Sequence, residues 1–332
     1  MRTHKQIPRV VFFASGAFGL PVLDALLREH ISPRWVITLP DAPAGRNRRP
    51  RPTPVRTRAE KHHAQVRMPA DLGAPEFLSA IKHVAPDVFI IAAYGKILPK
   101  ALLSLPKKGT LNIHPSLLPK YRGPSPVQAA ILHGDAHAGV SIMLTDEKMD
   151  HGPILAQKTH TIAGSRVSAP ELEARLGKEG AALLLTTLPR WLAGEINPQP
   201  QAHEQATYTK LLTKENGHID WREPAETIER KIRAYQPWPS AYTFWKQENG
   251  RQMQLQLLRA SVIPASEDTK LVGTVYAHKH TAICARAADD AFTVMTGDGA
   301  LCISSLKPEG KKEMSATAFL AGHPEIIGAT FI

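Results

Sequence analysis

Short apolar runs alternate with helical patterns over residues up to about 190, and this alternation constrains the fold more than any other feature of the sequence. The runs that we predict as strands are Val10–Ala14, Trp35–Leu39, Val88–Ala92, Thr110–His114 and Val140–Leu144. The stretches that we predict as helices are Pro21–Glu29, Pro75–Val84 and Val127–His133. Such alternation predicts an α/β fold, Rossmann-like, with a mostly parallel sheet covered by helices on both faces.

A polar stretch with two prolines and no periodicity follows at residues 196–209, and we interpret it as a linker. Beyond it the pattern changes to one helix, Ala225–Ala234, and then to short strands joined by turns. These strands are Gln254–Val262, Gly273–Ala277, Ala282–Ala285, Phe292–Met295 and Ala300–Leu306. Short strands of this kind favour a small barrel or sandwich. The predicted organisation is therefore a first domain at 1–195, a linker, and a second domain at 210–332.

The net charge of +11 indicates an anionic partner, which could be nucleic acid, an acidic substrate or a membrane surface. No apolar stretch is long enough to span a membrane, and no secretory pattern precedes the first strand. We therefore expect a cytoplasmic protein with no membrane partner. Charge alone does not choose among the remaining partners.

Asn112 and His114 end one of the predicted strands, and residues two apart on a strand share a face. Open parallel sheets bind their ligands at this end of the strands. A carboxamide beside an imidazole can hydrogen-bond a carbonyl oxygen and move a proton. A core histidine beside a turn-capping asparagine would give the same pattern. Asp150, in a later polar loop, could join them or could simply shape its turn.

An arginine-rich stretch with interspersed prolines and no acid follows the second predicted strand. Its arginines are Arg46, Arg48, Arg49, Arg51, Arg56 and Arg58. A solvated run would normally mix signs, so we expect RNA contact here rather than a merely soluble loop. Lys307, Lys311 and Lys312 are predicted on a loop of the second domain, where they could touch phosphates or form a plain exposed turn. The pair His133 and His137 lacks a third ligand nearby, and we expect no metal.

Three segments together resemble the signature of the folate-dependent formyltransferases. They are Asn112-Ile-His114-Pro-Ser-Leu-Leu-Pro119, Tyr121-Arg-Gly123 and Met149-Asp150-His-Gly152. In that family an Asn, a His and an Asp are catalytic, which implies these roles for Asn112, His114 and Asp150. The resemblance also implies a folate cosubstrate, 10-formyltetrahydrofolate. Its pterin would lie along Ile91, Ala92, Ala93 and Tyr94 and along the turn Ser116, Leu117, Leu118 and Pro119.

The second domain resembles that of one branch of the family, which formylates methionine attached to initiator tRNA. The matching segments are Ile219-Asp-Trp221, Arg233–Pro239 and Ser305–Ser315. The branch implies a charged initiator methionyl-tRNA as partner, an OB-like barrel, a monomer, and a tRNA-reading role for the arginine-rich stretch, with Arg46 at the family's important arginine. Formyltransferases of glycinamide ribonucleotide share the first motif but end after one domain. The alternatives are formylation of a small amine or amino sugar, hydrolysis of formyl-folate, and an RNA-binding module without chemistry.

The loop after the first strand departs from the family pattern. Ser15-Gly-Ala-Phe-Gly19 stands where the family commonly has Gly-Thr-Pro followed by an acid. The glycines still allow a tight turn, so the expected fold is unaffected. Contacts that the usual residues make to the folate or the methionine are not carried over to this chain.

Overall fold

The structure is a computed structural model that describes residues 7–44, 49–264, 271–277 and 292–332. It divides into two compact units. Unit 1 comprises Met1–Val127, Ala136–Ala163 and Glu171–Lys210, and unit 2 comprises Gln128–Asp135, Gly164–Pro170 and Leu211–Ile332. The segment 199–209, within the predicted linker, belongs to unit 1 and pairs with it, since Gln199 bridges Ile154 and Tyr208 bridges Arg122.

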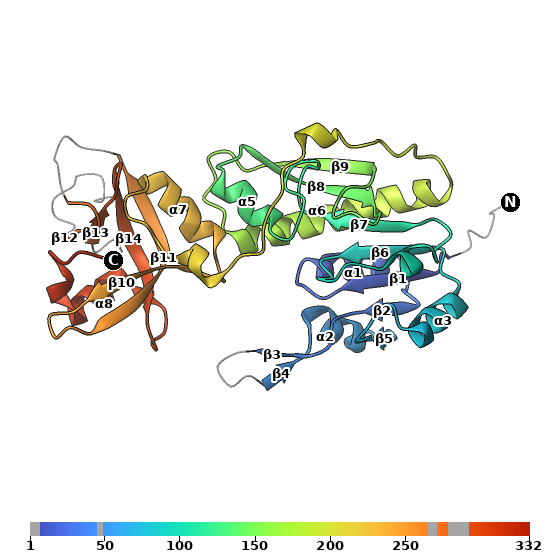
Figure 1. Ribbon diagram of the computed structural model, residues 1–332, viewed down its shortest axis with the longest axis horizontal. Helices are drawn as coiled ribbons and strands as arrows, with labels where there is room; N and C mark the ends of the chain where they lie inside the picture. The colour runs from blue at the N-terminus through green and yellow to red at the C-terminus, as the bar shows by residue number, and fades with distance from the viewer. Residues whose placement is uncertain (1–6, 45–48, 265–270, 278–291) are drawn as a thin grey trace. The chain divides into compact units, whose positions relative to one another are not determined.

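Unit 1 is built on a seven-stranded sheet with the order β5-β2-β1-β6-β7-β8-β9 (Figure 1). The strands are β1 (Val10–Ala14), β2 (Trp35–Ile37), β5 (Val66–Arg67), β6 (Val88–Ala92), β7 (Thr110–His114), β8 (His137–Leu144) and β9 (Ile154–Thr161). The first five in this order are parallel, and β8 and β9 are antiparallel to their neighbours. The predicted Rossmann-like, mostly parallel sheet is confirmed.

Helices cover both faces of this sheet because β1 and β6 are apolar on both faces and fully buried. Phe13 and Ile91 are register partners on one face and share a core cluster with Ile81 of α3 (Pro75–Val84). On the opposite face α6 (Ala169–Leu192) approaches β7 so closely that a Cβ at Gly180 would lie 2.8 Å from Ile113. The remaining helices of unit 1 are α1 (Gly19–Arg28), α2 (Pro54–Lys61) and α4 (Lys100–Leu103). Most of α5 (Pro126–Leu132) belongs to unit 2.

The arginine-rich stretch is partly structured. A short hairpin of β3 (Ala42–Ala44) and β4 (Arg49–Arg51) is followed by helix α2, which Thr53 caps through its hydroxyl. Arg56 and Arg58 lie on this helix and form ion pairs with acids distant in sequence, at 2.7 Å from Asp41 and Asp24 respectively. These two arginines are therefore paired although the arginine-rich stretch itself contains no acid, because their counter-charges lie outside it.

Unit 2 contains a small antiparallel barrel. The strands are β10 (Ala241–Lys246), β11 (Gln252–Ile263), β12 (Val275–Ala277), β13 (Phe292–Met295), β14 (Ala300–Pro308) and β15 (Met314–Ser315), in the order β10-β11-β14-β13-β12 with β15 beside β14. The C-terminal residues close the gap between the outer strands, since Phe331 bridges Trp245 and Thr330 bridges Thr274. This arrangement confirms the small barrel domain. The predicted strand Ala282–Ala285 lies outside the described residues.

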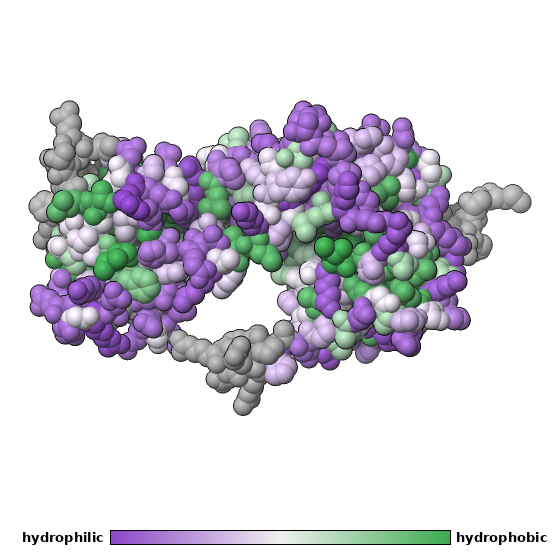
Figure 2. Space-filling model, viewed as in Figure 1, coloured by the Kyte–Doolittle hydropathy of each residue, from purple (hydrophilic) through white to green (hydrophobic). Residues whose placement is uncertain are grey.

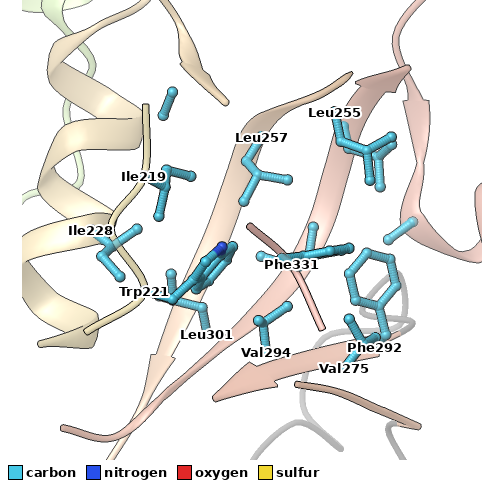
Figure 3. Packing of buried hydrophobic residues seen from close by; sticks show 14 of the residues in the cluster. Ile219, Trp221, Ile228, Leu255, Leu257, Val275, Phe292, Val294, Leu301 and Phe331 are labelled. Atoms are coloured by element: carbon cyan, nitrogen blue, oxygen red, sulfur yellow. The ribbon is translucent and has the colours of Figure 1, made fainter. Parts of the chain in front are cut away.

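The barrel is filled by apolar side chains from its strands and from two helices, α7 (Ala225–Ala234) and α8 (Ala316–Gly322). Figure 3 shows Trp221, Leu257, Leu301 and Phe331 converging on the same interior. Figure 2 shows hydrophilic residues over most of the visible face of each unit, with apolar residues in small groups. Within the described ranges, no helix is both long and apolar enough to cross a bilayer.

Candidate active site

Asn112 and His114 lie on the last three residues of β7 and point to one face of the sheet. Asn112 pairs in register with Ile91, which lies on the face of the sheet covered by α3. Ile113, between Asn112 and His114, points to the opposite face, toward α6. Asn112 is half-buried and His114 is only 5% exposed. The alternation of a buried sheet strand therefore places both polar side chains together where the strand ends.

Asp150 meets this pair from the loop that joins β8 to β9. Its Oδ1 accepts a hydrogen bond from Asn112 Nδ2 at 3.2 Å and lies 3.6 Å from His114 Nδ1. Its Oδ2 accepts the backbone N–H of Gly123 at 2.8 Å. Its backbone is left-handed, with φ of 49°, a conformation that Asp and Asn tolerate better than most residues. The structure brings the three predicted catalytic residues into one cluster.

The His114 ring is oriented by a backbone carbonyl. Nε2 lies 3.0 Å from the Tyr121 carbonyl oxygen, which can only accept, so Nε2 carries a proton. Nδ1 is then the nitrogen that faces Asp150 and that can take or give a proton. A proton on Nδ1 would make an imidazolium beside a carboxylate, a charged state that the two groups stabilise mutually.

The predicted folate-binding residues differ in how they are presented. Ala93 is exposed with φ of 50°, and its carbonyl oxygen accepts the N–H groups of Ser15 and Gly16 at 3.0 and 3.1 Å. Ile91 and Ala92 are buried in β6. The Tyr94 ring packs against Phe13 in the core, and burial raises its pKa to about 12.

The turn after His114 is anchored from below by two neighbouring strands. Ser141 Oγ donates to the Ser116 carbonyl at 2.6 Å, and Gln157 Nε2 donates to the Leu118 carbonyl at 2.9 Å. Ser116 and Leu118 are buried, whereas Leu117 and Pro119 are partly exposed. Of the predicted folate-binding set, Ala93, Leu117 and Pro119 are thus the side chains open to a ligand.

The divergent loop Ser15–Gly19 is held by hydroxyl groups. Ser15 Oγ accepts the Leu39 N–H at 3.0 Å and lies 3.3 Å from Thr38 Oγ1. Thr38 in turn lies 2.6 Å from Thr53, the cap of α2. Ser15 therefore ties the ends of β1 and β2 to α2, and the turn forms without the usual family residues.

The predicted tRNA-binding residues are placed unevenly. Arg46 and Arg48 lie outside the described residues, and Arg49 lies on β4. Arg51, at the end of β4, is exposed. Lys307 is half-buried on β14 rather than on a loop, because β14 extends to Pro308, whereas Lys311 and Lys312 are exposed in the turn that follows. Across the part of the chain that the structure describes, no group of His, Cys, Asp and Glu is arranged to hold a metal.

Two buried polar residues near Asp150, Arg122 and Gln201, are not predicted as site residues from the sequence. Arg122 is 2% exposed and donates through Nη2 and Nε to Gln201 Oε1 at 2.7 and 3.2 Å. Its Nη2 also lies 2.8 Å from His203 Nδ1, which must therefore be unprotonated. Desolvation, with His151 and Arg122 nearby, lowers the pKa of His203. Arg122 lies within the segment Tyr121-Arg-Gly123 that resembles the family, but no pattern in the sequence indicates a role for Gln201.

Comparison with known proteins fits this arrangement. The family model for formyl transferase matches residues 8–188, and the model for the formyl transferase C-terminal domain matches residues 211–324. The methionyl-tRNA formyltransferase of Chloroflexus aurantiacus is 44% identical over 314 residues, covering 95% of this chain and 96% of the relative. The chain belongs to the methionyl-tRNA formyltransferase family. Another family member, from Chloroflexus aggregans, is 44% identical over 322 residues and is covered to 99%.

Solved structures share the family fold. HypX from Aquifex aeolicus in complex with tetrahydrofolic acid matches with a TM-score of 0.61 at 19% identity over 97% of this chain. The chain spans about half the length of HypX, covering 48% of it. The N-formyltransferase from Helicobacter canadensis, in complex with folinic acid and dTDP-3-aminofucose, matches with a TM-score of 0.62 at 15% identity. At these identities the likeness establishes the fold alone.

Proposed function

We propose that this protein transfers the formyl group of 10-formyltetrahydrofolate to the free amino group of methionine on charged initiator tRNA. The observation that carries the proposal is the cluster of Asn112, His114 and Asp150, in a chain that matches methionyl-tRNA formyltransferases along nearly its whole length. The reaction belongs to translation initiation, and we place it in the cytoplasm, where the protein acts as a monomer.

The reaction is acyl transfer from one nitrogen to another. The methionine amine attacks the formyl carbon, a new C–N bond forms, and the bond from that carbon to the folate nitrogen breaks. Negative charge develops on the formyl oxygen in between. Asp150 occupies one N–H of the Asn112 carboxamide, and the second N–H is free to donate to that oxygen.

A proton must move from the attacking amine to the leaving folate nitrogen. His114 Nδ1 is the suitable relay atom, because Nε2 is committed to the Tyr121 carbonyl. Asp150, 3.6 Å from Nδ1, stabilises the imidazolium while the proton resides there. The amine attacks the formyl carbon directly, so the mechanism requires no covalent enzyme intermediate, and the proton that the amine loses is passed to the leaving folate nitrogen.

Substrate contacts are proposed on the residues predicted from the sequence. The pterin lies along the end of β6 at Ala93 and the turn containing Leu117 and Pro119, which are open to a ligand. The acceptor end of the tRNA contacts the arginines of the β3–β4 region, with Arg46 and Arg51 among them. Lys311 and Lys312, exposed on unit 2, contact other phosphates of the tRNA.

An acceptor competition tests this function. Charged initiator tRNA, free methionine and a nucleotide-linked amino sugar would be offered together at equal concentration with labelled 10-formyltetrahydrofolate. We expect the label on methionyl-tRNA and almost none on the small amines. Label mainly on the amino sugar would instead make the protein a small-amine formyltransferase, and the arginines would lose their proposed role.

A further inference from the structure

The segment between the two family-matched regions supplies a buried glutamine to the site. Gln199 exchanges two backbone hydrogen bonds with Ile154, each of 2.8 Å, and this pairing carries Gln201 under the Asp150 loop. Gln201 is 5% exposed, although the stretch around it is polar. We infer that Gln201 is a positioning residue that holds Asp150 against Asn112 and His114, an inference that rests on the proposed function.

All hydrogen-bonding capacity of the Gln201 carboxamide is used. Nε2 donates to the carbonyl oxygens of Asp150 and Gly152 at 2.9 and 2.7 Å. Oε1 accepts both Nε and Nη2 of Arg122. Carbonyls only accept and a guanidinium only donates, so this network admits a single orientation of the amide. A fully satisfied buried amide of this kind fixes the groups around it.

Asp150 requires such support because its backbone is left-handed and its loop is otherwise polar and open. Its neighbour Met149 is 50% exposed. Gln201 holds the Asp150 carbonyl, and the N–H of Gly123 holds the carboxylate. Arg122, which donates to Gln201, directly precedes Gly123 in the chain. The two groups that hold Asp150 are therefore linked through adjacent residues.

The two halves of the amide have separable roles. Its oxygen accepts hydrogen bonds from the buried Arg122 guanidinium without neutralising its charge. This is a structural role. Its N–H groups set the position of Asp150, which is a catalytic positioning role. Gln201→Glu keeps acceptors for Arg122 and removes both donors, whereas Gln201→Leu removes all four hydrogen bonds.

We expect Gln201→Glu to lower the melting temperature less than Gln201→Leu does, because the pairing with Arg122 is kept while two carbonyls lose their donor. We expect it to lower kcat by about 10–100-fold, since displacements near 1 Å have effects of this order. Gln201→Leu should lower both kcat and the melting temperature. Gln199→Ala, on an exposed side chain of the same segment, is the matched control and should change neither. A purely structural role predicts normal kcat in Gln201→Glu, and that result would overturn the inference.

A double-substitution cycle tests whether the effect passes through Asp150. If it does, Gln201→Glu combined with Asp150→Asn has the kcat of Asp150→Asn alone. Additive losses would contradict the inference. NMR chemical shifts of the His114 ring and the Asn112 carboxamide give a readout independent of turnover, and both should move in Gln201→Glu but not in Gln199→Ala. Unchanged chemical shifts would overturn the inference even if the acceptor competition supports the proposed function, and changed ones would support it even if that competition fails.

Discussion

The Asn112 carboxamide donates one N–H to Asp150 and has a second available for the substrate, so its mutation tests catalysis with little effect on packing. A mutation of His114 would change packing and catalysis together. Its ring is buried and bonded to the Tyr121 carbonyl, so His114→Ala would leave a cavity and an unsatisfied acceptor as well as remove the proton relay. At the residue scale the chemistry is therefore best tested at Asn112.

Asn112→Ala should lower kcat by about 10²–10³-fold, the usual effect of losing one donor to a developing oxyanion. The melting temperature should change little, because Asn112 is half-buried and no apolar packing is lost. Steady-state kinetics with charged initiator tRNA, beside thermal unfolding, gives both values. Asn197→Ala, on an exposed side chain, is the control. A turnover near normal in Asn112→Ala would rule out the oxyanion role.

At the scale of the element, Gly139 of β8 lets the turn that contains Leu117, which we propose contacts the folate, approach the sheet. A Cβ at this position would lie 2.5 Å from the Lys158 carbonyl oxygen and would overlap the Leu117 side chain. Gly139→Ala should therefore destabilise the fold by about 1–3 kcal/mol and raise KM for the folate by displacing the turn. Folate titration and thermal unfolding measure the two effects. Gly322→Ala, which meets nothing within 4 Å, should leave both unchanged.

The start of β1 is fastened to the start of β6 by an ion pair. Arg9 Nη2 lies 3.0 Å from Asp87, and hydrogen bonding from Arg9 lowers the pKa of Asp87. This stabilisation is present above the unfolded-state pKa and is lost as pH falls through the lower folded-state value. Asp87→Asn should lower the melting temperature slightly at pH 7. The difference should shrink below about pH 4; a constant difference across pH would refute the ion-pair origin.

Elements with clear periodicity could be predicted from the sequence, and elements that depend on packing could not. Val88–Ala92 and Ala225–Ala234 have the predicted bounds because their apolar patterns are unambiguous. Helix α6 was missed because Gly177, Gly180 and Pro189 look like helix breakers. The two glycines are instead sites of close approach to Phe18 and Ile113. Helix α2 could not be predicted because its arginines leave no clear apolar periodicity and because Pro54 resembles a helix breaker. Pro54 is in fact well suited to the first turn of a helix.

The candidate site divides in the same way. Asn112 and His114 could be paired from strand alternation, whereas Asp150 could be added only through the family resemblance, because a loop carries no register. Gln201 could not be predicted, since its role arises from contacts with residues 79 and 51 positions away along the chain. Polar stretches between domains look alike in sequence, whether they are exposed or support a site.

At the scale of the whole molecule, the net charge of +11 favours RNA binding only where the cations are exposed and not already paired with acids. Arg51 is exposed, whereas Arg58 is paired with Asp24. Replacing Arg51 by Ala should weaken tRNA binding and flatten the log–log dependence of affinity on salt by up to about 0.9, the slope expected per neutralised phosphate on a duplex. Arg58→Ala is the control and should flatten it less. Equal slopes in Arg51→Ala and the unaltered protein would exclude a phosphate contact there.

The central claim is that the Asn112, His114 and Asp150 cluster formylates methionine on initiator tRNA. Its most direct test is the single-turnover transfer of labelled formyl from 10-formyltetrahydrofolate to charged initiator tRNA, by the unaltered protein and by Asp150→Asn. Asn keeps the size and the left-handed backbone preference of Asp but not its charge. We predict formylmethionine from the unaltered protein and a rate about 10²–10⁴-fold lower with Asp150→Asn, at equal tRNA affinity. No formylmethionine from the unaltered protein, or an equal rate with Asp150→Asn, would contradict the account.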